Sequence, residues 1–236
     1  MSHRDPLILL CNQITTKNHL QISQKLQNYQ PTDYIRVLHN LCCEEPTYAS
    51  VVQKTIAAIP NTCLETKYEI LQNRIIEMIN CGLDKSDTEW ILPWIRLGII
   101  PKVENEDSID TELRERRVKK FWIGNLKFLC FLYKSRVIES FDLFFETLKN
   151  SVERNEDTRG WVLPEGLQQI LMLCGKDIYD RERALCDQMC SVLDDSARFV
   201  YGDHRLQMLI SMVLDLQRTG FVRRRRDRTR SRSRQT

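Results

Sequence analysis

Apolar residues recur at helical spacing along almost the whole of this 236-residue chain. Side chains three and four positions apart lie on one face of a helix, so the spacing predicts a series of amphipathic helices. Runs that alternate between polar and apolar residues are few, and the chain has only eight glycines and seven prolines. The sequence therefore favours an all-α fold over an all-β fold.

About ten helices are expected, joined by short polar turns. In the longest one, a buried stripe is expected at Val118, Trp122, Leu126, Leu129 and Tyr133. The predicted helices are Thr32–Cys43, one that opens at Pro46, Leu64–Ile79, a short one after a capping box at 86–89, a long one from Ser108 or Asp110 to about Ile138, one with Phe141–Val152, one that opens at Pro164, two that follow caps at Asp180 and Asp203, and two weaker ones near 5–15 and 19–28.

Helices of these lengths with short connections suit antiparallel pairs. Pairs that repeat every ~40–47 residues are HEAT-like units, and five of them would nearly fill the chain up to its tail. The predicted architecture is an α-solenoid of about five antiparallel helix pairs. Such a fold exposes long surfaces and loop edges, which suit binding better than catalysis.

Charge divides the chain into a helical-repeat body, residues 1–222, and an arginine-rich tail, residues 223–236. The tail has eight arginines and one acid, which gives +7, so the total of +3 leaves −4 for the body. A segment of this composition buries no core and is expected to be disordered when free, and its guanidinium groups suit RNA. The expected RNA-binding residues are Arg223, Arg224, Arg225, Arg226, Arg228, Arg230, Arg232 and Arg234.

Two other roles stay open for the tail, a nuclear import signal and a solubilising end. Ser231 and Ser233 lie between arginines and are candidates for phosphorylation, which would cancel about half of the tail's charge. Nine cysteines without a CxxC pair favour reduced, buried thiols in an intracellular protein. The apolar run Leu7–Leu10 is too short for a signal peptide or a membrane span. A cytoplasmic location is expected, with a nuclear one as the alternative.

Motifs of common enzymes are missing from the sequence, including the phosphate-binding loop, the dinucleotide-binding glycine pattern, the GxSxG elbow and HExxH. His39 and Cys42 can share a helix face, but no second pair completes a metal site. Cys186 and Cys190 lie in apolar surroundings and are expected in the core. The sequence therefore predicts neither an enzyme nor a cofactor or a metal.

Three segments carry a resemblance to a known family. The stretch FWIGNLKFLCFLYKSRVI at 121–138 resembles the GN(I/L)KFxxxLxK pattern in the middle domain of eukaryotic translation initiation factor 4 gamma. The stretches at 167–180, with its GKDI phrase, and at 211–227 resemble later parts of that domain. Weaker similarities come earlier, at Cys11–Thr15, Cys43–Tyr48 and Leu71–Arg74, so the resemblance covers roughly residues 8–226 in family order.

The resemblance implies an adaptor that binds the DEAD-box RNA helicase of initiation and also RNA, with other initiation factors as further partners. ATP hydrolysis would belong to the helicase. Helicase-binding residues are expected at loop edges and at the polar positions of the pattern, which are Gln13, Glu45, Asn73, Arg74, Lys127 and Lys176.

The chain also departs from the family. The cap-binding-protein motif of the family, Tyr-x4-Leu followed by an apolar residue, is missing, because Gln207 follows Leu206. The segment Asp84–Pro101, with Trp90 and Trp94, replaces a highly charged stretch. An adaptor of RNA processing or nonsense-mediated decay with the same fold is the alternative, and the Arg-Ser tail favours it. The sequence does not decide whether initiation is promoted or restrained.

Overall fold

The computed structural model describes residues 5–60, 62–81, 108–153, 162–197 and 203–221. Within these residues ten α-helices pack against one another and no strand occurs. The predicted all-α class is thus confirmed for the part of the chain that is described. The predictions for Trp90, for most of the loop at 153–160 and for the tail at 223–236 lie outside it.

The first half of the chain forms short and medium helices. They are α1 (Pro6–Cys11), α2 (His19–Leu26), α3 (Pro31–Glu44), the 3-10 helix η1 (Pro46–Tyr48), α4 (Ala49–Ala58) and α5 (Leu64–Cys81). The second half begins with the longest helix. Its elements are α7 (Ser108–Lys134), α8 (Asp142–Glu153), α9 (Val162–Arg181), α10 (Arg183–Ala197) and α11 (His204–Arg218).

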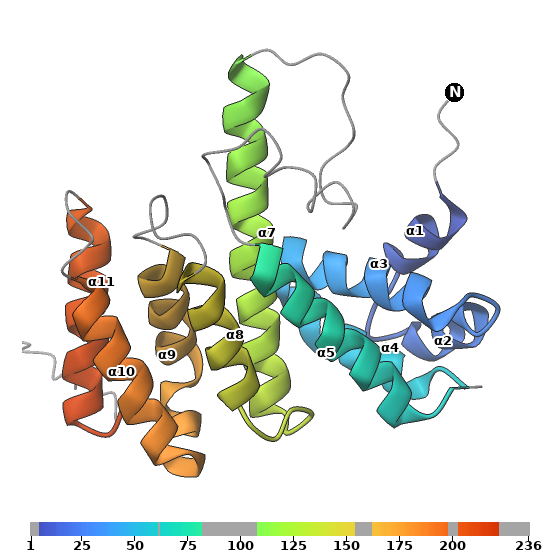
Figure 1. The fold of residues 1–236 in the computed structure, drawn as a ribbon. Helices are drawn as coiled ribbons and strands as arrows, with labels where there is room; N and C mark the ends of the chain where they lie inside the picture. The colour runs from blue at the N-terminus through green and yellow to red at the C-terminus, as the bar shows by residue number, and fades with distance from the viewer. Residues whose placement is uncertain (1–4, 61, 82–107, 154–161, 198–202, 222–236) are drawn as a thin grey trace, which may run out of the picture.

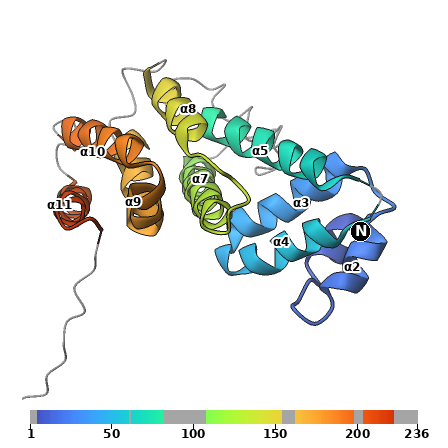
Figure 2. The same cartoon turned by 90° about the horizontal axis from the view of Figure 1, so that it is seen from below.

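The helices follow one another across the molecule in roughly chain order, from α1 and α2 at one end to α11 at the other (Figures 1 and 2). Helix α7 stands at the centre, where it packs against α3 and α5 on one side and against α9 on the other. Its N-terminal half extends beyond the rest of the body in Figure 1. The long helix therefore joins the two halves of the fold.

The core runs through all of these helices. The stripe predicted on α7, which includes Trp122, is completely buried, and so is Phe128 of that helix. Cys186 and Cys190 are buried as expected, and neither forms a disulfide bond. None of the helices in the described ranges is long and apolar enough to cross a membrane.

Helix ends differ from prediction in several places. The long helix ends at Lys134, before the expected Ile138, because Arg136 adopts a left-handed backbone with φ of 58°. Pro46 opens the short η1 helix, and the α-helix itself starts at Ala49. The prediction that Asp180 caps a helix is wrong. Helix α9 continues to Arg181 past a kink at Cys174, and the Asp180 carboxylate pairs with Lys176 one turn earlier at 2.7 Å.

The cap predicted for the last helix is confirmed. Asp203 Oδ1 accepts a hydrogen bond of 2.9 Å from the backbone N–H of Leu206.

Candidate functional site

Gly124, in the first resembling segment, lies where α7 crosses the end of α3. A Cβ atom built at Gly124 would lie 1.9 Å from the carbonyl oxygen of Cys43. Any side chain would therefore push the two backbones apart. Glycine at this position permits the close approach of α3 and α7.

Asn125, the next residue, joins three helices from a fully buried position. Its Nδ2 donates to the carbonyl oxygen of Ile75 on α5 at 3.2 Å, and its Oδ1 lies 2.8 Å from Nε2 of His39 on α3. Because that oxygen only accepts, His39 Nε2 carries the proton and donates it. We call Gly124, Asn125 and His39, with Phe128 beside the His39 ring at 5.9 Å, the inner crossing.

The chemistry at His39 is that of a neutral core residue. Burial, with the nearby Arg74 charge as a smaller contribution, lowers the pKa of His39 to about 3. The thiol near its Nε2 is Cys43, at 3.4 Å, where the sequence suggested Cys42. No group of three or more His, Cys, Asp or Glu residues in the described ranges is placed to hold a metal ion.

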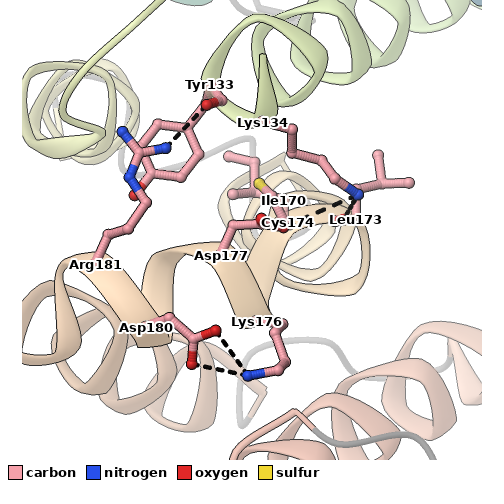
Figure 3. Close-up of polar contacts among 9 residues, drawn as sticks. All are labelled: Tyr133, Lys134, Ile170, Leu173, Cys174, Lys176, Asp177, Asp180 and Arg181. Atoms are coloured by element: carbon pink, nitrogen blue, oxygen red, sulfur yellow. Dashed lines mark hydrogen bonds and ion pairs between the residues drawn. The ribbon is translucent and has the colours of Figure 1, made fainter. Parts of the chain in front are cut away.

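The three resembling segments contact one another although they are distant in sequence. Lys134 Nζ of α7 donates to the carbonyl oxygen of Leu173 at 3.3 Å and lies 3.9 Å from a carboxylate oxygen of Asp177 on α9 (Figure 3). A Cβ atom at Gly175 would lie 2.4 Å from the ring of Phe221, the residue that follows the last helix by three positions. Gly175 of the second segment therefore leaves space for the Phe221 ring of the third segment.

Arg181, which sequence reasoning missed, fastens the end of α9 to the end of α7. Its guanidinium donates to the carbonyl oxygens of Tyr133 at 2.9 Å and Glu139 at 2.8 Å, and it lies 3.9 Å from the centre of the Tyr133 ring (Figure 3). Arginine over an aromatic face is a favourable pairing. We call Lys134, Asp177 and Arg181 the outer contact. No local pattern could reveal it, because its partners are about 40 residues apart.

Glu182 acts beside Arg181 at the same junction. Its carboxylate accepts hydrogen bonds from the Tyr133 hydroxyl at 2.7 Å and from the Phe141 backbone N–H at 3.1 Å, just before α8. Burial and this carboxylate raise the pKa of Tyr133. The short turn between α9 and α10 therefore holds the turn between α7 and α8 in place.

The six residues predicted to bind a helicase lie on five different elements or turns. Four of them are exposed, whereas Lys127 and Arg74 are half-buried. Arg74 Nη2 donates to Asn40 Oδ1 at 2.9 Å. Their positions are the turn after α1 for Gln13, the turn between α3 and η1 for Glu45, α5 for Asn73 and Arg74, α7 for Lys127, and α9 for Lys176. The fold does not gather them into one cluster.

A groove brings two of these positions near each other. It lies between the end of α3 and helix α7, has a volume of about 350 Å³, and includes Lys127 together with Glu44 and Pro46, the neighbours of Glu45. Lys176 lies instead on α9, on the far side of α7 (Figure 1). Any partner that contacts both must reach across α7.

We call this hollow the basic groove. Its positive side chains come from α7 and are Arg116, Lys119, Lys120 and Lys127. Spacing along α7 places these four residues within three turns, but only the fold shows that they face the end of α3, some 70 residues earlier.

The described geometry offers polar surfaces and grooves for binding. The polar and glycine residues of the resembling segments are used mainly to pack helices together. No family model matches this sequence, and no curated protein is significantly similar to it.

Proposed function

We propose that this chain is a non-enzymatic adaptor of translation initiation that binds a DEAD-box RNA helicase and RNA. Its body would be an α-solenoid of about five antiparallel helix pairs, similar to the middle domain of initiation factor 4 gamma. In this proposal ATP chemistry belongs to the helicase, and the chain positions it.

The observation that carries this proposal is the role of the resembling residues in packing. Gly124 permits the crossing of α3 and α7, Asn125 joins α3, α5 and α7, and Gly175 makes room for Phe221. Apolar residues at core spacing would occur in any helical protein. Glycines at close helix contacts and a buried amide that bonds to two other helices are more specific, and they support a shared fold along the length of the resemblance.

The order of packing supports the solenoid. Helix α3 packs against α7, α7 against α9, and α9 against α10 and α11, so contacts lead from each part of the chain to the next. The row of helices in Figure 1 fits this description. Neighbour-to-neighbour packing leaves long edges exposed, which suits a partner with two lobes.

The helicase surface is proposed at the exposed residues among those predicted. Glu45 and Asn73 are well exposed and lie on the α3–η1 turn and on α5, two elements of the same half. Lys176 would supply a contact on the other half, where it is exposed although paired with Asp180. Other initiation factors are further candidate partners.

RNA is proposed to bind the arginine-rich tail, residues 223–236, because it carries +7 whereas the body carries −4. If four to six arginines touch phosphates, log K should fall by about 3–4 for each tenfold rise in salt. Deleting the tail should remove most of this slope, and glutamate at Ser231 and Ser233 should weaken binding by less. Fluorescence anisotropy with a labelled single strand measures both, and an unchanged slope after deletion would contradict this assignment.

A second candidate function is that of an adaptor in RNA processing or nonsense-mediated decay. The arginines and serines at the end of the chain favour it, because such a tail suits nuclear import as well as RNA. A nuclear location would accompany this function, and a cytoplasmic one would accompany initiation.

The test is a titration of purified chain into purified helicases. We expect the chain alone to hydrolyse no ATP and to raise the RNA-dependent ATPase rate of the initiation helicase. A helicase of nuclear RNA processing, titrated in parallel, separates the two functions by which enzyme responds. If neither helicase binds or changes its rate, both proposals fail.

A further inference from the structure

The basic groove has a marked excess of positive charge. Among the described residues that line the groove, four are cationic and one, Glu44, is acidic. Lys119 pairs with Glu165 at 2.7 Å, and both Arg116 and Lys119 have further interactions. No ion pair joins Lys120 or Lys127 to any of the described residues.

The cations follow the length of the groove. Arg116 and Lys127 are eleven positions apart on one helix, which corresponds to roughly 16 Å at 1.5 Å per residue. Lys120 lies between them in sequence, and Glu44 and Pro46 line the same groove from the end of α3 and from η1. The groove therefore presents a line of positive charge, which suits an extended or helical ligand better than a single small anion.

The floor of the groove is apolar. It is formed by Ile123 and Gly124 of α7 and by Cys43 and Pro46 opposite them. Ile123 is only partly buried, so part of its side chain faces the groove. An apolar floor below a charged rim suits a ligand with both aliphatic and charged groups.

Chemistry of the lining separates two classes of ligand. Surfaces that hold single-stranded RNA combine cations with aromatic rings on which bases stack. None of the described side chains that line this groove is aromatic. A peptide ligand can place aliphatic side chains against Ile123 and Pro46 and carboxylates beside the lysines. It then complements both the apolar floor and the charged rim.

We propose that the basic groove between α3 and α7 binds an acidic segment of a partner protein. Its aliphatic side chains lie on Ile123 and Pro46, and its carboxylates pair with Lys120 and Lys127. In this arrangement an amphipathic segment binds with its apolar face against the floor of the groove. It goes beyond the adaptor function and does not depend on which helicase binds.

The experiment uses the full chain and a labelled probe. The probe is a fluorescein-labelled peptide of about 12 residues, the helical length that matches the line of cations, with leucines at i, i+4 spacing and glutamates elsewhere. We expect Lys120→Glu with Lys127→Glu to weaken its binding about tenfold, because attraction becomes repulsion at two contacts. Ile123→Ser should also weaken it while leaving the salt dependence unchanged.

A matched control reverses two lysines away from the groove, Lys17→Glu with Lys54→Glu, which are both exposed. The arginine-rich tail is the same in all variants, so its attraction for the acidic probe cancels. Thermal melting checks that each variant is folded.

Equal binding by the groove variant and the control would overturn the proposal, since the probe would then be held elsewhere. So would loss of binding to a labelled oligouridylate strand in the groove variant without loss of the peptide, which would assign the groove to RNA.

Discussion

Helix α7 contributes to two polar junctions that differ in depth. The inner crossing is buried, with Asn125 and His39 fully inaccessible and each tied to another helix. The outer contact lies at the surface, where the side chains of Lys134 and Asp177 are 50 % and 40 % exposed. The α7 residues of both junctions belong to the same resembling segment, yet water screens only the outer one.

This difference in burial indicates which polar positions stabilise the fold. A buried hydrogen bond is costly to break because the remaining partner is left without water. An exposed ion pair contributes little, since water replaces the partner. The inner crossing should therefore dominate stability, and the exposed Lys134–Asp177 pair of the outer contact should be nearly neutral.

The largest expected effect is in the apolar part of the inner crossing. Phe128→Ala should lower the free energy of unfolding by about 3–5 kcal/mol, because a fully buried ring is removed. Phe131→Ala is the matched control, since that ring stacks on Phe128 but is only half-buried. Urea unfolding measures both, and equal losses would show that depth does not separate these positions.

Gly124→Ala should cost about 2 kcal/mol, because the new methyl group meets the backbone of Cys43 and the helices must separate. Alanine is intrinsically the better helix former, so the same substitution at an uncrowded glycine would raise stability. Ser50→Ala, at an exposed position of α4, controls for helix propensity. A melting temperature raised by Gly124→Ala would disprove the close crossing.

Acid should weaken the inner crossing through His39. The folded state binds fewer protons than the unfolded state between the folded pKa of about 3 and the unfolded value of 6.5. The contribution of neutral His39 is therefore complete above pH 6.5 and is lost as the pH falls. Between pH 7.5 and 5.5 the loss should be about 1.4 kcal/mol.

The variant His39→Gln keeps a donor for Asn125 but does not titrate in this range. Urea unfolding at both pH values should show a smaller loss for the variant than for the native chain. The same loss in both proteins would mean that other groups cause the acid sensitivity.

The smallest effect is expected at the outer contact. Lys134→Ala should change stability by no more than about 0.5 kcal/mol, because the ion pair is long and exposed. Added salt should reduce even this difference. A loss as large as that of Gly124→Ala would remove the distinction between the two junctions.

Sequence patterns predicted the helices well because each helix has its own apolar face. The stripe on α7 and the cap at Asp203 follow from spacing alone. The end of α7 was misplaced since Arg136 takes a left-handed conformation that non-glycine residues seldom adopt. Asp180 was assigned to the wrong helix because its side chain suits a cap and an i, i+4 pair equally.

Sites were harder to predict than helices. The basic groove and the Arg181 and Glu182 contacts join residues 40 to 80 positions apart, which no local pattern reveals. The resemblance did point to Gly124 and Asn125, but it could not tell a packing role from a binding role. Their burial assigns them to packing and leaves exposed positions such as Glu45 and Asn73 for a partner.

The most direct test of the adaptor proposal compares two proteins in one ATPase assay. The native chain should raise the RNA-dependent rate of the initiation helicase. Glu45→Lys with Asn73→Lys, which alters two exposed side chains and none of the inner crossing, should need about ten times more protein for the same effect. If the native chain leaves the helicase rate unchanged, the proposed function is contradicted, and if the variant matches the native chain, its helicase surface lies elsewhere.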